Sequence, residues 1–175
     1  MLSLSYHLVA HGWSKAVVSD RTSSVTLTAS YQSDALGELT DAAIALLRGD
    51  EHAMCVWLEE PGEYRWHFNR FEDNVQITIV WFDDWAGYRD DHDHGKVIFL
   101  TRCHRRHLAR QILGQLKRVL GDVGDDGYKE RWGAHNFPMD SYRSLEGLVS
   151  AASSTSTGSG GSMRRPRERV IPGGP

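Results

Sequence analysis

Cysteine and long apolar runs are scarce in this sequence, and each scarcity excludes a class of protein. Two cysteines, Cys55 and Cys103, occur among 175 residues, too few for the disulfide framework of a small secreted domain. No apolar run approaches the roughly 20 residues that span a bilayer. The first residues, MLSLSYH, lack the basic and apolar regions of a secretory signal. We therefore expect a cytoplasmic chain without a membrane partner. A single bridge between the two cysteines stays open, because both fall on predicted strands.

The sequence also lacks a strong excess of charge of one sign. It holds 20 basic and 23 acidic residues, a net charge of −3, which argues against a general nucleic-acid binder. Hydrophobic residues make up 40% and charged residues 25%, as in globular proteins rather than disordered chains. A globular domain of ordinary size is the expectation.

The composition divides the chain into three parts. Residues 1–150 read as a single domain, and residues 151–162 (AASSTSTGSGGS) read as a flexible linker without charge or large apolar side chains. Residues 163–175 form a basic tail with four arginines and one glutamate, which leaves the body with 16 basic and 22 acidic residues. Three interpretations of this tail stay open. It is a natural disordered tail, a tethered peptide that binds the body, or an arm that contacts nucleic acid or a membrane surface. Native and engineered origins both stay open.

Alternation of apolar and polar residues predicts an α+β fold. The expected architecture is a single antiparallel meander of about five to seven strands, with two main helices on one face and a short C-terminal helix. The expected strands cover 4–10, 13–19, 24–31, 52–59, 63–70, 75–82 and 96–103. The expected helices cover 34–48, with Ser33 or Asp34 as N-cap, then about 104–121, a turn near 126–133, and 140–150.

The loop before the last strand is the most unusual segment. It combines carboxylates with two aromatic side chains, which suits recognition of a basic peptide through ion pairs and cation–π contacts. The predicted binding residues are Asp83, Asp84, Trp85, Tyr88, Asp90 and Asp91. The alternative interpretation is a solvated acidic turn.

The same loop offers a weaker metal-site hypothesis. The candidate ligands for Zn²⁺ or another divalent ion are Asp91, His92, Asp93 and His94. Cys103, His104 and His107 could add donors, but one strand of about 25 Å separates them from the loop. The prediction is therefore no cofactor, with a metal-dependent hydrolase kept as an alternative function.

Signals for other enzymes are absent from the sequence. There is no GxSxG motif and no phosphate-cradling glycine-rich loop after a strand. Glu60 and Asp83 could meet as an acid–base pair only if strand pairing places them at the same end. A basic stretch on the second helix is a further alternative, as a nucleic-acid contact through Arg102, Arg105, Arg106 and Arg110.

Three segments resemble a family of small bacterial proteins that forms a domain of unknown function. They are YHLVAHGWSKAVVSD (6–20), EEPGEYRW (59–66) and WFDDWAGY (81–88). The resemblance covers roughly residues 1–148 and implies no catalytic residue and no ligand. Size, acidity and α+β layout are also similar to immunity proteins of bacterial toxin systems, by architecture alone. The leading hypothesis is a non-enzymatic module, adaptor or immunity-like, that binds a protein or a basic peptide, including its own residues 163–175.

Overall fold

The fold is an α+β arrangement of seven strands and three helices, seen in a computed structural model that describes residues 1–9, 11–84 and 95–154. The strands are β1 (Ser3–Leu8), β2 (Trp13–Ser19), β3 (Ser24–Ser30), β4 (His52–Leu58), β5 (Glu63–Phe71), β6 (Asn74–Phe82) and β7 (Lys96–His104). The helices are α1 (Ala35–Arg48), α2 (Arg105–Trp132) and α3 (Met139–Ser154). The predicted class is confirmed, and each strand lies within two residues of its predicted bounds.

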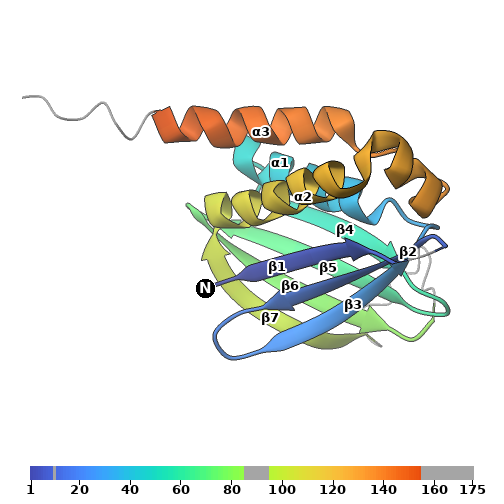
Figure 1. Cartoon of the computed structure of the whole chain (residues 1–175). Coiled ribbons are helices and arrows are strands. Elements are labelled where there is room, and N and C mark those ends of the chain that lie inside the picture. The colour runs from blue at the N-terminus through green and yellow to red at the C-terminus, as the bar shows by residue number, and fades with distance from the viewer. Residues whose placement is uncertain (10, 85–94, 155–175) are drawn as a thin grey trace, which may run out of the picture.

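The strands form two antiparallel sheets rather than the single sheet expected. One has the order β1-β2-β3 and the other β4-β5-β6-β7. Figure 1 shows the three-stranded sheet in front of the four-stranded one, with the helices together on one side of the strands. Helix α1 stands between β3 and β4 in the chain and contacts β4. Helix α1 connects β3 to β4, where a hairpin would have continued one sheet. Alternation within a strand does not show which strands pair, so it could not predict the division into two sheets.

One hydrophobic core joins both sheets to the helices. Tyr6 of β1 and Trp57 of β4 meet with ring centroids 5.9 Å apart, and Trp57 lies 5.0 Å from Trp66 of β5. Leu39 of α1 and Ile112 of α2 are fully buried in the same cluster. Trp57, Trp66 and Trp132 are among the largest side chains that are fully buried in this core.

Local signals place the helix ends. The Asp34 carboxylate accepts from the Gly37 N–H and caps α1, and Gly49 ends that helix in a left-handed conformation with φ 118°. Helix α2 is interrupted once, at Gly124 (φ 70°, ψ 178°), and then resumes, so the expected separate turn near 126–133 is its last part. Helix α3 includes residues 151–154, which the composition assigned to the linker. Alanine and serine at these positions continue a helix that is already nucleated.

Both cysteines are free thiols. Cys55 lies on β4 and Cys103 on β7, the two edges of the four-stranded sheet. Three strand spacings of about 4.8 Å separate these edges, far beyond the reach of a disulfide.

Among the described helices, none is long and apolar enough to cross a membrane.

Candidate protein-binding surface

The candidate surface lies at one end of the four-stranded sheet. Because β4 to β7 form an antiparallel meander, the turn after β4 and the segment after β6 emerge at the same end. The register confirms this, since Leu58 pairs with Glu63 and Glu63 pairs with Phe82. The structure therefore places Glu60 and Asp83 at the same end of the sheet, a question that the sequence left open. We call Gln32, Glu60, Pro61, Asp83 and Asp84 the acidic end.

A buried ion pair within β5 lies next to the acidic end. The carboxylate of Glu63 is 3% exposed and lies 2.6 Å from Nε of Arg65, which is itself 11% exposed. The Arg65 guanidinium also lies over the Phe82 ring, 4.5 Å from its centroid. A buried pair of this kind fixes geometry more than it stabilises the fold, so strand ends β5 and β6 are held in one relative position.

Glu59 connects the acidic end to the three-stranded sheet. Its carboxylate accepts hydrogen bonds from the Thr28 hydroxyl of β3 and from the Tyr64 hydroxyl, the latter at 3.0 Å. Burial, with a smaller contribution from the Glu59 charge, raises the pKa of Tyr64 to about 12. Tyr64 therefore stays protonated and donates to Glu59 at physiological pH.

The acidic end is hollowed. A depression of about 430 Å³ is lined by Gln32, Glu60, Pro61 and Asp84. The Gln32 amide donates to the Glu60 carboxylate at 2.8 Å, and the peptide bond between Glu60 and Pro61 is cis. Glu60, Asp83 and Asp84 are all exposed, so their charges face solvent across the depression. This arrangement offers carboxylates to a cationic group, as salt-bridge and hydrogen-bond acceptors.

The rest of the predicted binding loop lies outside the described residues. This applies to Trp85, Tyr88, Asp90 and Asp91. The described flanks of that segment lie at the acidic end, since Asp84 lines the depression and Gly95 packs beside Phe82. A Cβ atom on Gly95 would lie 2.5 Å from the Phe82 ring, so any larger residue at this position would clash.

The metal hypothesis gains nothing from the described residues. Asp91, His92, Asp93 and His94 lie outside them, and residues 1–9, 11–84 and 95–154 hold no group of three potential ligands. His104 caps α2 by accepting from the Arg106 N–H at 3.1 Å, and His107 Nε2 lies 2.7 Å from the Leu2 carbonyl. Burial raises the pKa of Cys103 to about 11, which disfavours the thiolate that a metal requires.

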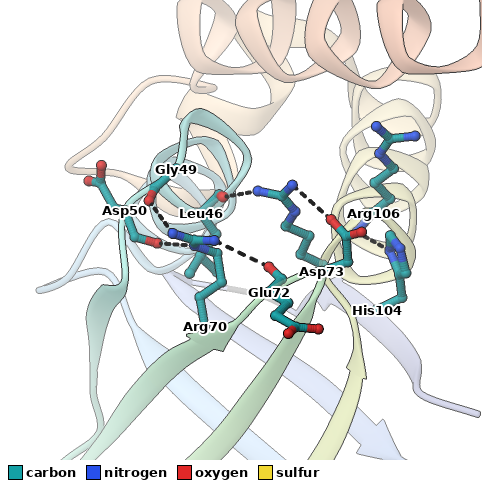
Figure 2. A network of polar contacts seen from close by, with 9 residues as sticks. Leu46, Gly49, Asp50, Arg70, Glu72, Asp73, His104 and Arg106 are labelled. Carbon is teal, nitrogen blue, oxygen red and sulfur yellow. Dashed lines mark hydrogen bonds and ion pairs between the residues drawn. The ribbon is translucent and has the colours of Figure 1, made fainter. Parts of the chain in front are cut away.

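The basic residues proposed for nucleic acid occupy different settings. Figure 2 shows a corner where the end of α1 meets the β5–β6 turn and the start of α2. There Arg105 donates to Asp73 at 2.9 Å and to the Leu46 carbonyl at 3.3 Å. Arg70, from β5, donates to the Gly49 and Asp50 carbonyls at 2.7 and 3.0 Å.

These contacts give the corner a structural role. Arg70 and Arg105 bind carbonyls at and just beyond the C-terminal end of α1, where intrahelical donors are missing. Arg106 lies on the same corner, Arg102 lies on the outer face of the sheet, and Arg110 is exposed on α2. Sequence reasoning missed Thr28 and Gln32, because their hydrogen bonds to Glu59 and Glu60 depend on how the two sheets pack together.

Comparisons with known proteins add little to this geometry. No protein-family model matches the chain, and no curated protein sequence matches it. A solved chain from the CdiA-CT/CdiI toxin and immunity complex from Enterobacter cloacae aligns with a TM-score of 0.41 and 10% identity. That alignment covers 67% of this chain and 99% of that chain. A likeness this weak carries no functional argument. The resemblance of three segments to a bacterial domain of unknown function stays a prediction.

Proposed function

We propose that this chain is a non-enzymatic module that binds a basic peptide or a basic protein segment at the acidic end. An adaptor or immunity-like role is the concrete form. The observation that carries the proposal is the depression lined by Gln32, Glu60, Pro61 and Asp84, with Asp83 beside it. Exposed carboxylates on a rigid base favour a cationic partner through charge-assisted hydrogen bonds.

The rigidity of the base favours binding over simple solvation. The Glu63–Arg65 pair and the hydrogen bonds to Glu59 hold the acidic end before any partner arrives. Less side-chain entropy is then lost on association. Among the predicted residues, Trp85 follows Asp84 directly in the sequence and Tyr88 comes three positions later. Both would add aromatic contacts to arginine side chains.

The test uses a basic sequence that the chain itself contains. In a full-length variant, Arg164, Arg165, Arg167 and Arg169 are changed to glutamine, so that the attached copy cannot compete. Calorimetric titration with a synthetic peptide of residues 163–175 is expected to give a dissociation constant on the order of micromolar. Glu60→Gln combined with Asp84→Asn should weaken this affinity about tenfold or more.

The matched control lies at the opposite end of the same sheet. Glu72 is exposed in the β5–β6 turn, so Glu72→Gln removes one charge, as Glu60→Gln does by itself. Glu72→Gln should leave the affinity unchanged, whereas Glu60→Gln alone should weaken it. Trp85→Ala with Tyr88→Ala should also weaken binding. No binding at millimolar peptide, or equal weakening by Glu72→Gln, would contradict the proposal for this ligand.

A further inference from the structure

Helix α2 lies along the free edge of β1, and its side chains bind the backbone of that strand (Figure 1). The Leu4 N–H donates to the Gln111 side chain at 3.2 Å, and the Tyr6 N–H donates to the Gln115 side chain at 3.1 Å. The two glutamines stand four positions apart on one helix face, and the two amides stand two positions apart on one strand edge. One turn of helix thus matches two residues of strand, and the edge is closed to further pairing.

Arg118 follows Gln115 on the next turn of α2 and binds the end of this edge. Its guanidinium donates to the Tyr6 carbonyl and, at 3.0 Å, to the Gln115 side chain. It also donates to Nδ1 of His7 at 3.2 Å, since an arginine offers donors and no acceptor. A neutral His7 that accepts at Nδ1 carries its proton on Nε2. Arg118 therefore fixes which nitrogen of His7 is free to donate.

A small depression lies where the end of β1 meets α2. Its volume is about 70 Å³. Because a water molecule occupies about 30 Å³ in the liquid, this space suits an ion of a few heavy atoms and is too small for a whole nucleotide. The lining combines four polar with three apolar side chains, which are His7, Arg118, Asp122 and Arg131 with Leu8, Val119 and Val123.

The break in α2 at Gly124 brings Arg131 to this depression. In a continuous helix, residues 118 and 131 would lie about 20 Å apart along the axis and about 140° apart around it. Gly124 instead has φ 70° and ψ 178°, a conformation that glycine adopts readily and other residues rarely do. The Gly12 N–H donates to the Arg131 carbonyl at 2.8 Å, which ties the last part of α2 to the β1–β2 turn. Arginines from both parts of the helix thus line one site.

The charge of the depression favours an anion. Two guanidinium groups and one imidazole face a single carboxylate. The Asp122 carboxylate lies 3.5 Å from the Arg118 guanidinium, and the two side chains are 61% and 34% exposed. An exposed pair of this length is weak, so an anion of higher charge can displace it. Within the described part of the chain, no side chain or carbonyl binds the Arg131 guanidinium, which leaves its donors available.

We propose that this depression binds a phosphate group, either as inorganic phosphate or as the terminal group of a small monoester. Arg131 would bind two of the phosphate oxygens, and Nε2 of His7 would donate to a third. Arg118 would exchange its contact with Asp122 for one with the anion. A free carboxylate carries no more charge than the Asp122 already in place, whereas a phosphate dianion does. This inference is independent of the proposed function, because it uses a different surface and a ligand of opposite charge.

The test titrates the full-length chain with inorganic phosphate by calorimetry at about pH 8, where phosphate is mostly a dianion. Sodium chloride at about 0.15 M screens non-specific attraction. We expect a dissociation constant below about 1 mM, a similar value for methyl phosphate, and at least about tenfold weaker binding of acetate. Arg131→Gln should weaken phosphate binding about tenfold or more. Asp122→Asn should strengthen it about two- to fivefold, because the competing carboxylate is removed.

Two matched variants change the same charges outside the depression. Arg110 and Asp126 are exposed on α2 and do not line it, so Arg110→Gln and Asp126→Asn should leave phosphate binding unchanged. In amide NMR spectra, phosphate should shift the signals of His7 and Arg131 most, and circular dichroism checks that each variant folds. A preference for inorganic over methyl phosphate would assign the site to the free ion. No saturation at about 10 mM phosphate, equal binding of acetate, or equal effects of the matched variants would overturn the proposal.

Discussion

Gly62 shows how closely the β4–β5 turn packs against the neighbouring strand. A Cβ atom there would lie 2.2 Å from the Trp81 ring and 2.5 Å from the Phe82 carbonyl oxygen. Gly62→Ala should therefore lower the free energy of unfolding by about 1–3 kcal/mol, since overpacking forces backbone shifts. Urea denaturation of the full-length chain measures this change.

Gly114 provides the matched glycine. It lies inside α2, and a Cβ atom there would meet nothing within 4 Å. Gly114→Ala should raise the free energy of unfolding by about 0.5–1 kcal/mol, because alanine loses less backbone entropy in a helix. Equal effects of the two substitutions would show that the β4–β5 turn is not tightly packed.

Glu38 couples the fold to pH. Burial raises its pKa, although its bond to the Val56 N–H acts in the opposite direction. Between the ordinary pKa and the raised one, the folded chain binds more protons than the unfolded chain. The free energy of unfolding therefore increases as pH falls through this window, and decreases to a constant lower value above it.

Glu38→Gln keeps an acceptor for the Val56 N–H and removes the titration. The difference in unfolding free energy between this variant and the wild type should change between the ordinary pKa of a glutamate and the raised pKa of Glu38, with the wild type gaining relative stability toward the acidic side. Denaturation curves at several pH values measure it. Burial also raises the pKa of Asp34, which the variant still contains. The stability of the variant should therefore keep part of the wild-type dependence on pH. Parallel curves would contradict the assignment.

At the scale of elements, the sequence predicts strands and helices better than their assembly. Alternation along Val75–Phe82 and the apolar stripe of α1 follow directly from burial of one face, so their spans agree with the structure. The division into two sheets depends on which strands pair, and alternation is the same for either arrangement. The acidic end is a similar case, because Glu60 and Asp83 lie at the same end of the sheet only through the pairing order of β4 to β7.

The contacts between α2 and β1 give a prediction at this scale. Gln111→Ala leaves the partly buried Leu4 N–H without an acceptor and should cost about 1–3 kcal/mol of stability. Amide exchange at Leu4 should accelerate in this variant. Gln111→Glu retains an acceptor and should keep the exchange slow, which separates the hydrogen bond from simple helix packing. Unchanged exchange in the alanine variant would mean that the edge is closed by other groups.

At the scale of the whole molecule, the two sheets share one core. Tyr6 and Trp57 belong to different sheets and lie in one continuous cluster with residues of α1 and α2. Thermal unfolding should therefore be a single cooperative transition, with equal calorimetric and van't Hoff enthalpies. Coincident melting by far- and near-ultraviolet circular dichroism provides the second probe. Two separated transitions would show that the sheets are independent units.

The contacts between β1 and α2 also have a consequence for synthesis of the chain. The amides of Leu4 and Tyr6 bind side chains that follow them by 107 and 109 positions. At about 5–20 residues per second, translation delivers those side chains only after on the order of 5–20 s. During this interval the first hairpins present an open edge to other nascent chains. Silent changes that slow translation between the codons for β3 and α2 should therefore lower the yield of folded protein without altering a single residue.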